Sequence, residues 1–449
     1  MSLPPADQDP SDPVVRVAAA LAARHPHIMI PDLARMTDLM DVLGSPQRAY
    51  PSIHLTGTNG KTSTARMVDA LLRAHGLRTG RYTSPHLQGF TERICLDGQP
   101  IRADRLGQIW DEVAPYIDIV DGRHREALTF FEVGTALAFA AFADAPVDVA
   151  VVEVGLGGTW DATNVLDAQI AVIGTVDLDH TDLLGEDVGA IATEKAGIVH
   201  EGATVISAAQ SPEAARAILS RVAATGARLI AEGVGAQIVD RRLAVGGQLL
   251  ALQTPAATYE DLLLPLHGAH QARNALLALC AVEAFLGGRV LDADVVREGF
   301  AAADSPGRLE VVRTSPTVLL DGAHNPAGGR ALAAALDEAF EFRRLVGVVG
   351  VLADKDTVGL LEALAPHLDH LVATEPDSPR ALPAEDVAAI GRDLLDPDDV
   401  TLAASLADAL DLAFAWADQE GEGVGGIGVL VTGSLVTVGQ ARGLLTRRR

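Results

Sequence analysis

Two runs of apolar residues constrain the fold of this chain more than any other feature. Residues 147–154 read VDVAVVEV, and residues 169–176 read QIAVIGTV. Near-continuous apolar, β-branched runs of this length are typical of strands covered on both faces, as in a parallel sheet between layers of helices. Amphipathic segments of helical period alternate with shorter β-like runs along most of the chain, which predicts an α/β fold.

A group of turn residues at 304–308, reading DSPGR, divides this alternation into two parts. Before it, we expect strands at 52–55, 147–154 and 169–176, helices at 62–74 and 269–286, and an antiparallel appendage within 242–264. After it, we expect strands at 317–320, 345–351, 371–373 and 429–432, with helices at 327–340, 357–364, from about 384, and 406–416. The predicted organisation is a phosphate-loop domain with a mainly parallel sheet over 1–304, a linker at 305–309, and a smaller Rossmann-like domain over 310–449.

Composition excludes several classes of partner. The formal net charge is −25, whereas a protein that binds nucleic acid needs a basic face. No apolar run reaches the ~18–20 residues that span a bilayer, so we expect no membrane partner. Residues 1–12 are rich in Pro and Asp and predict a disordered tail. Cys95 and Cys280 are too far apart to suggest a disulfide framework or a metal site, which fits a reducing cytoplasm.

Only three of the 35 basic residues are lysines, namely Lys61, Lys195 and Lys355. Arginine stays protonated and planar, whereas lysine is a compact charge that burial can convert into a neutral amine. Because the chain otherwise uses arginine for its positive charges, each remaining lysine is a candidate for chemistry that arginine cannot perform. The alternative is that the three lysines remain by chance.

Lys61 lies in the motif GTNGKT, between the strand at 52–55 and the helix at 62–74. The two glycines permit a tight turn whose backbone N–H groups point at a phosphate, while the lysine reaches the β- and γ-phosphates and the following threonine binds Mg²⁺. Leu55 stands where the Walker A pattern has its first glycine, so the loop is a shorter variant. The predicted ATP-binding residues here are Gly57, Thr58, Asn59, Gly60, Lys61 and Thr62.

Metal-ligating side chains follow other strands of the same predicted sheet. Ser84 follows a short β run, Glu153 ends the strand at 147–154, and His180 lies among aspartates in DLDHTD. Strand ends of a parallel sheet are where α/β proteins place their ligands, and Mg²⁺ prefers oxygen ligands. We therefore predict a metal site at this edge, with a solvated carboxylate and a surface histidine as the alternatives.

The second domain carries a similar edge. Asp321 and His324 follow the strand at 317–320, and Arg308 in the break is placed to reach a phosphate or to be a linker charge. Lys355 lies between two aspartates and is a candidate contact for phosphate or an acidic substrate. The alternative is a surface ion pair, which is worth little.

Short motifs in a fixed order then make the chain similar to the folylpolyglutamate synthase/dihydrofolate synthase family, which is related to the Mur ligases. The stretches that carry the resemblance are 57–62 (GTNGKT), 82–87 (YTSPHL), 129–132 (TFFE), 153–164 (EVGLGGTWDATN), 179–185 (DHTDLLG), 194–198 (EKAGI), 267–274 (HGAHQARN), 305–309 (SPGRL), 321–326 (DGAHNP) and 431–439 (VTGSLVTVG). The resemblance implies a two-domain Mur-ligase-like fold.

The resemblance also implies roles for individual residues. Asn274 would lie near the adenine of ATP, with Arg308, Asp321 and His324 as further ATP contacts. Two Mg²⁺ sites would use Thr62, Ser84, Glu153, His180 and Lys195, the lysine having taken up CO₂ as a carbamate. Lys61, Glu153, His180 and Lys195 would be the catalytic residues. His324, Lys355 and Ser434 are candidate contacts for glutamate or phosphate.

The folate would contact three segments, and the resemblance again supplies their positions. Phe130, Phe131 and Trp160 offer flat rings to a pterin, although the two phenylalanines have a plain core alternative. The predicted folate-binding residues are Ala34, Arg35, Met36, Thr129, Phe130, Phe131, Glu132, Trp160, Asp161 and Ala162.

The expected activity is ATP-dependent addition of L-glutamate to dihydropteroate, to folate polyglutamates, or to both, through an acyl phosphate. We expect a bifunctional, monomeric enzyme. One rival is a Mur-type cell-wall precursor ligase, which residues 129–132 and 161–164 disfavour. The other is a non-catalytic nucleotide switch, disfavoured because no lysine lies in an Asn-Lys-x-Asp segment.

Overall fold

The computed structural model describes residues 12–24, 30–419 and 426–447. The chain forms two compact units. The N-terminal unit comprises Leu3–Pro265 and Gln271–Asp304, and the C-terminal unit comprises Leu266–His270 and Ser305–Arg449. The tail expected at 1–12 lies outside the described residues except for Asp12, which caps α1 (Pro13–Ala22).

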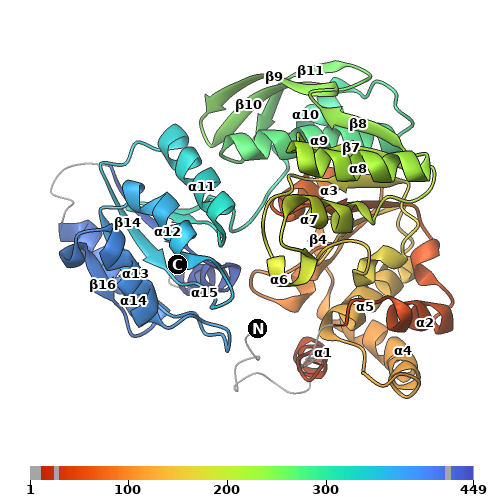
Figure 1. The fold of residues 1–449 in the computed structure, drawn as a ribbon, viewed down its shortest axis with the longest axis horizontal. Helices are drawn as coiled ribbons and strands as arrows, with labels where there is room; N and C mark the ends of the chain where they lie inside the picture. The colour runs from red at the N-terminus through yellow and green to blue at the C-terminus, as the bar shows by residue number, and fades with distance from the viewer. Residues whose placement is uncertain (1–11, 25–29, 420–425, 448–449) are drawn as a thin grey trace. The chain divides into compact units, whose positions relative to one another are not determined.

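Parallel strands form the centre of the sheet in the N-terminal unit (Figure 1). The strand order is β11-β10-β9-β8-β7-β6-β1-β5-β2-β3-β4. Every residue of β1 and of β5 is buried, as expected for strands covered on both faces. The strands β1, β2, β5, β6, β7 and β8 span Ser52–Thr56, Thr79–Tyr82, Val149–Glu153, Ile170–Ile173, Thr204–Ser207 and Arg228–Glu232.

Antiparallel strands extend this sheet at both ends. At one end, β9 (Gly235–Ala244), β10 (Gly247–Gln253) and β11 (Thr258–Leu264) form the expected appendage. The appendage begins at Gly235, earlier than predicted, because β9 is rich in polar residues and was not recognised as a strand from its sequence. At the other end, β3 (Ile94–Leu96) and β4 (Gln99–Pro100) complete the sheet.

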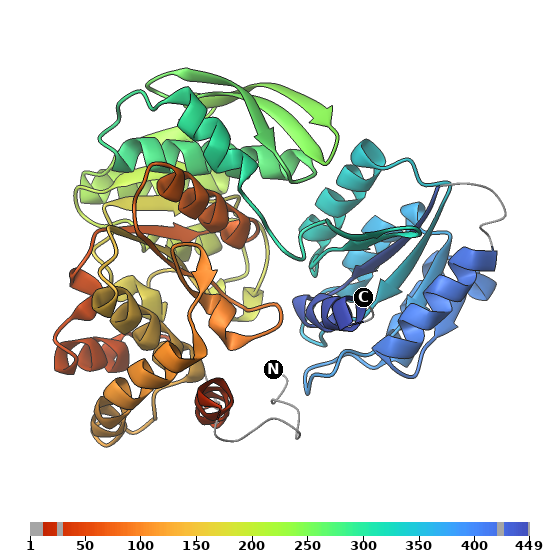
Figure 2. The same ribbon diagram turned by 180° about the vertical axis from the view of Figure 1, so that it is seen from behind.

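Helices cover both faces of the sheet. Figures 1 and 2 show α7 and α8 on one face and α3 and α10 on the other. Of these, α3 follows β1 directly, so the β1–α3 turn lies at the carboxyl edge of the parallel strands. The helices α2, α3, α4, α5, α6, α7, α8, α9 and α10 span Ala34–Val42, Lys61–Ala74, Ala103–Asp121, Phe130–Asp144, Thr181–Leu184, Val188–Ala196, Pro212–Thr225, Ala269–Phe285 and Ala293–Ala301, and the 3₁₀ turns η1, η2 and η3 span Pro46–Arg48, Phe90–Arg93 and Ala162–Val165.

The C-terminal unit is a smaller sheet with the order β12-β13-β17-β14-β15-β16. Its strands span Glu310–Thr314, Thr317–Leu320, Ile427–Thr432, Arg344–Val349, His370–Ala373 and Val400–Leu402 in that order. All neighbours are parallel except the β12–β13 hairpin at one edge. The helices α11, α12, α13, α14 and α15 span Pro326–Ala339, Thr357–Leu364, Ala384–Leu394, Leu406–Gln419 and Leu435–Arg447, and the turns η4 and η5 span Ala365–His367 and Pro397–Asp399.

These two sheets confirm the predicted α/β class, with a mainly parallel N-terminal sheet and a smaller C-terminal one. Within the C-terminal unit the prediction missed β12, β16 and α15; β12 is a largely exposed edge strand, and β16 has only three residues. It also missed the segment Leu266–His270, which belongs to the C-terminal unit. There the His267 ring lies 5.1 Å from that of Phe340. Within the described ranges, no helix is both long and apolar enough to cross a bilayer.

Candidate active site

The phosphate loop joins β1 to α3 and depends on Gly60. This residue has φ 81°, a left-handed conformation that glycine adopts without strain. A Cβ atom there would lie 2.6 Å from Oδ1 of Asn274, which projects from α9. Asn274 is in turn held by Gln271, whose Oε1 accepts from its Nδ2 at 3.0 Å. The structure therefore brings the predicted adenine contact, Asn274, against the phosphate loop.

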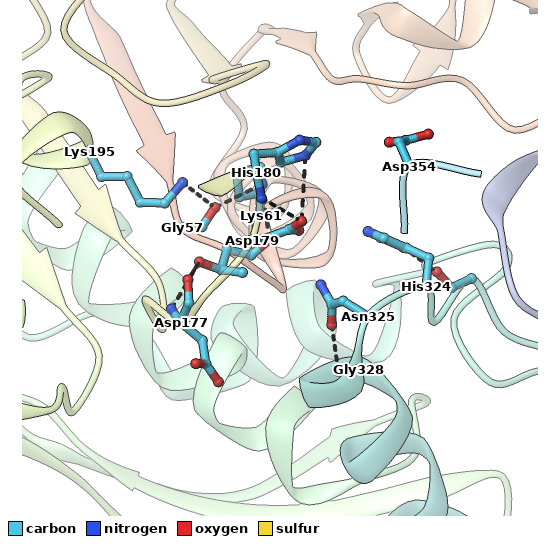
Figure 3. A network of polar contacts seen from close by, with 12 residues as sticks. Gly57, Lys61, Asp177, Asp179, His180, Lys195, His324, Asn325, Gly328 and Asp354 are labelled. Atoms are coloured by element: carbon cyan, nitrogen blue, oxygen red, sulfur yellow. Dashed lines mark hydrogen bonds and ion pairs between the residues drawn. The ribbon is translucent and has the colours of Figure 1, made fainter. Parts of the chain in front are cut away.

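Two lysines converge on one carbonyl oxygen of this loop (Figure 3). Lys61 Nζ donates to the Gly57 oxygen at 2.8 Å and to the Thr58 oxygen at 3.2 Å. Lys195 Nζ, arriving from α7, donates to the same Gly57 oxygen at 3.1 Å. Burial first, and the charge of Lys61 second, lower the pKa of Lys195 to about 7. At neutral pH the buried amine is therefore neutral in about half of the molecules.

Glu153 ends β5 beside the first turn of α3, and only 1% of it is exposed. Thr62 Oγ1 donates to its two carboxylate oxygens at 2.9 and 3.0 Å, and the Ser84 backbone N–H donates to Oε2 at 3.2 Å. Three of the predicted metal ligands thus meet at one edge of the sheet. A carboxylate with the Thr62 hydroxyl beside it suits Mg²⁺, which keeps several waters and takes further oxygens from substrate phosphates.

His180 lies in the loop after β6 and precedes α6. Its φ is 51°, an uncommon left-handed conformation for a residue other than glycine. The side chain is 37% exposed, and Nε2 lies 3.8 Å from Asp179 Oδ1. This loop is tied to the phosphate loop, because Thr58 Oγ1 donates to the Asp177 oxygen at 2.9 Å and accepts from its N–H at 3.0 Å. In the part of the chain that the structure describes, no three His, Cys, Asp or Glu side chains gather as a metal site, so a ligand role for His180 stays a prediction.

Two acidic residues hold the loop after β5, Asp161 from within the loop and Glu194 from α7. Asp161 is buried and accepts from the N–H groups of Leu156 at 2.9 Å and Thr163 at 3.0 Å. Burial raises the pKa of the Asp161 carboxyl group. Glu194 Oε1 accepts from the Gly158 N–H at 3.3 Å, and a Cβ at Gly158 would lie 2.7 Å from the Glu194 carbonyl oxygen. The loop can therefore lie directly on the end of α7 that carries Lys195.

Three predicted folate-binding residues have partners within the protein. Thr129 caps α5, with its hydroxyl accepting from the Glu132 N–H and its own N–H donating to the Glu132 carboxylate. Glu132 also forms a buried ion pair with Arg35 of α2, at 3.1 Å. These contacts hold α2 against the start of α5 and leave Arg35 without a free charge.

The two phenylalanines at the start of α5 differ in their surroundings. The Arg93 guanidinium lies over the Phe130 ring, 5.0 Å from its centre, and Phe90 meets the same ring edge-on. Phe130 is thus packed as the core alternative expects. Phe131 is half-buried, and its ring lies against Gly155, where a Cβ would be 2.4–2.9 Å away. Only Phe131 of this pair keeps ring surface at the loop after β5.

The remaining predicted folate contacts fall into different burial classes. Trp160 is half-buried beside the apolar cluster around α7, Ala162 is 7% exposed, and Ala34 is exposed at the start of α2. Met36 has no exposed surface, because the helical period turns it into the core beneath α2. Its side chain therefore offers no surface to a ligand in this arrangement.

In the C-terminal unit, Asp321 organises the turn after β13. Its carboxylate accepts from the N–H groups of Leu309 and Ala323, both at 2.8 Å. Burial raises the pKa of Asp321, and the neighbouring Arg308 opposes the shift. Arg308 packs over Gly322, where a side chain would collide with it. His324 Nδ1 lies 2.8 Å from the Gly322 oxygen, which fixes the ring beside this turn (Figure 3).

The other two predicted contacts of this unit lie at helix starts. Ser434 is buried and caps α15, accepting from the Thr437 N–H at 3.0 Å. Lys355 is half-buried in the turn before α12, where its N–H donates to the Leu352 oxygen at 3.1 Å. Asp356 caps that helix by accepting from the Gly359 N–H at 2.9 Å. The motif around Lys355 therefore has at least a structural role in starting α12.

Sequence reasoning missed a contact between Arg93 and His86 beside Phe130. Arg93 is 7% exposed, and its Nε donates to Nδ1 of His86 at 2.8 Å. Burial and then the charge of Arg93 lower the pKa of His86 to about 3, so the imidazole is neutral. A charged residue directly before the apolar triplet ICL was the only signal available.

Comparison with known proteins covers both units. The Mur ligase middle domain matches residues 55–282, and the Mur ligase, glutamate ligase domain matches residues 307–435. The dihydrofolate synthase/folylpolyglutamate synthase of Mycobacterium tuberculosis is 48% identical over 458 residues, covering 97% of this chain and 94% of that protein. Its Escherichia coli counterpart is 35% identical over 395 residues, covering 88% and 86%.

Solved structures agree with these matches. Mycobacterium tuberculosis folylpolyglutamate synthase complexed with ADP and AMPPCP is 49% identical, with a TM-score of 0.93 over 97% of this chain and 99% of that one. Escherichia coli FolC in complex with DHPP and ADP is 32% identical, with a TM-score of 0.85 over 98% and 100%. The similarity therefore extends over nearly the whole chain.

Proposed function

Because the chain belongs to the dihydrofolate synthase/folylpolyglutamate synthase family of ATP-dependent ligases, we propose that it joins L-glutamate both to dihydropteroate and to reduced folates. The resemblance that the short motifs indicated is confirmed. The observation that carries the proposal is the convergence of Lys61, Lys195 and Glu153 at the phosphate loop. Such an edge combines a cation, an amine with a lowered pKa and a carboxylate, which suits phosphate chemistry.

In the first step, the substrate carboxylate attacks the γ-phosphate of ATP to give an acyl phosphate and ADP. The loop N–H groups and Lys61 neutralise charge on the transferred group, and their fixed positions favour the transition state. Thr62, Ser84 and Glu153 would hold Mg²⁺, which when bound supplies further positive charge to the phosphates. In the second step, the glutamate amine attacks the acyl carbon and releases phosphate.

Lys195 has the properties that carbamate formation requires. A neutral amine can attack CO₂ and lose a proton, which converts a cation into an anionic oxygen ligand. Arginine cannot do this, since it is not deprotonated in proteins. The lowered pKa of Lys195 supplies the reactive amine at neutral pH. We propose that this carbamate, Glu153 and His180 are the groups that would hold a second Mg²⁺.

The pteroate end of the substrate would lie along the loop after β5. Phe131 and Trp160 are half-buried and offer ring surface there, whereas Phe130 is occupied by Arg93. In the C-terminal unit, Arg308 and His324 are the proposed contacts for phosphate, and Lys355 is the proposed contact for an acidic group of glutamate. Asp321 would act by holding the turn on which His324 lies.

A substrate panel tests the proposal. Purified enzyme with ATP and Mg²⁺ should release ADP in a glutamate-dependent manner with dihydropteroate and with tetrahydrofolate. If neither dihydropteroate nor tetrahydrofolate supports glutamate-dependent turnover, the proposed function is wrong. Turnover with only one of them would refute bifunctionality alone. Activity with a UDP-linked muramyl peptide in place of the pteroates would support the Mur-type rival.

A further inference from the structure

His54 is a fully buried histidine that none of the proposed steps uses. It lies in β1, three residues before the phosphate loop, and its Nε2 is 2.8 Å from the Thr163 hydroxyl. Thr163 Oγ1 in turn donates to Asp161 Oδ1 at 2.5 Å. These three side chains form a chain of hydrogen bonds from the central strand to the loop that carries Trp160.

The number of protons available on each group fixes the direction of these hydrogen bonds. A hydroxyl group has one proton, and that of Thr163 is donated to Asp161, so its oxygen can only accept from His54. His54 therefore carries its proton on Nε2. Its Nδ1 is buried and has no hydrogen-bond partner in the described ranges. Burial first, and His200 second, lower the pKa of His54 to about 3, so the ring stays neutral.

A second side chain of β1 supports the same loop. Thr56 lies two residues after His54 and thus on the same face of the strand. Its hydroxyl donates to the Gly157 oxygen at 2.8 Å. Thr56 therefore holds the beginning of the loop while His54 acts on its end, and both do so from the strand that leads into the phosphate loop.

Stability alone does not account for the imidazole. A buried polar atom without a partner destabilises the folded state, and an apolar side chain of similar size would avoid it. The imidazole does supply a proton donor that orients the Thr163 hydroxyl toward Asp161. Such a chain polarises each of its members and fixes a single arrangement. The imidazole is therefore better explained by the conformation of the loop than by the stability of the fold.

We propose that His54 is a positioning residue that, through Thr163 and Asp161, holds the loop at 155–164 in the conformation that receives the pteroate. This rests on the proposed function, because it assigns the pteroate to that loop. His54 does not touch the substrate. Its contribution is to fix the carboxylate and the backbone against which the substrate binds.

The test compares His54→Met with His54→Gln in the full-length enzyme. Methionine removes the donor, whereas the Nε2 of glutamine can replace that of histidine. We expect His54→Met to raise the KM for dihydropteroate about tenfold, as for the loss of one buried hydrogen bond. The KM for ATP and kcat should change less than about twofold, and His54→Gln should return the KM for dihydropteroate to within about twofold of the wild type.

His370→Met is the matched control. His370 Nε2 lies 2.9 Å from the Thr401 hydroxyl in the C-terminal unit, so this variant also breaks a partly buried histidine–threonine pair. It should change at most the melting temperature and leave the KM for dihydropteroate unchanged. If His54→Met likewise lowers only the melting temperature, or raises the KM for ATP and dihydropteroate equally, the proposal is wrong.

A second pair of variants covers the case in which His54→Met does not fold. Thr163→Ser keeps the hydroxyl and Thr163→Val removes it, so only the valine variant should raise the KM for dihydropteroate. Equal KM values for these two variants would overturn the proposal. A wild-type enzyme without glutamate-dependent turnover would instead refute the proposed function, which separates the two failures.

Discussion

Replacing Lys195 by methionine should stabilise the protein while it abolishes activity. Methionine keeps the apolar stem of the side chain and removes the charge. The pKa of Lys195 is lowered from 10.5 to about 7, and each unit corresponds to about 1.4 kcal/mol. The folded state is therefore destabilised by roughly 4–5 kcal/mol at pH 7 relative to a group with an unperturbed pKa. The variant also loses the hydrogen bond to Gly57, which costs it about 1 kcal/mol. Its free energy of unfolding should therefore exceed that of the wild type by about 3–4 kcal/mol.

The pH dependence of this gain has a definite sign. Above pH ~10.4 the amine is neutral in both states and the penalty is absent. As the pH falls, the unfolded chain binds a proton that the folded chain does not, so the free energy of unfolding of the wild type decreases until about pH 7. The penalty should be roughly 4 kcal/mol at pH 7 and roughly 2 kcal/mol at pH 9.

Urea unfolding in CO₂-free buffer measures this difference directly. The free energy of unfolding of Lys195→Met should exceed that of the wild type, by more at pH 7 than at pH 9. Added bicarbonate should stabilise the wild type but not the variant, because only the lysine can form a carbamate. Turnover should fall at least about 100-fold in Lys195→Met. A variant less stable than the wild type at pH 7, or a difference that does not change with pH, would refute the reasoning.

Three further substitutions test other parts of the structure. Lys61→Arg should lower kcat at least about 100-fold, because a planar fork replaces a compact charge in the loop; near-normal turnover in the ADP-release assay would contradict this. Gly60→Ala should raise the KM for ATP about tenfold through strain and collision with Asn274, whereas Gly44→Ala, which has φ 77° but no atom within 4 Å, should leave it unchanged. Burial raises the pKa of Glu283, so the wild type loses stability as this group ionises. The free energy of unfolding of Glu283→Gln should therefore rise relative to that of the wild type between about pH 4 and pH 8. The opposite trend in urea unfolding would argue against a buried acid.

Much of the fold and part of the site followed from local sequence. The phosphate loop was predictable because its glycines, lysine and threonine are contiguous, and β1 and α3 flank it as expected. Ser84 and Glu153 were predictable because they end parallel strands, which share one edge of the sheet. In both cases the chemistry lies within a few residues of a recognisable strand.

Contacts across the fold could not be predicted in the same way. The approach of Asn274 to Gly60 joins residues more than 200 positions apart and depends on where α9 lies. The stacking of Arg93 on Phe130 and the bond from His54 to Thr163 are also long-range. A single sequence records the polarity of these residues but not their partners, since register and helix placement decide them.

The shared Gly57 carbonyl links the chemistry of the two lysines. After burial, the charge of Lys61 is the second cause of the lowered pKa of Lys195, so the proposed phosphate-binding cation also favours the neutral form of its neighbour. Two cations side by side repel, but a carbamate on Lys195 turns the repulsion into attraction. A carbamate would remove the desolvation penalty of a buried ammonium group but would bring a buried anion that cations must compensate, and Lys61 would be one of them. We therefore expect the proposed carbamate and the phosphate loop to depend on each other, since each would stabilise the charge state that the other requires.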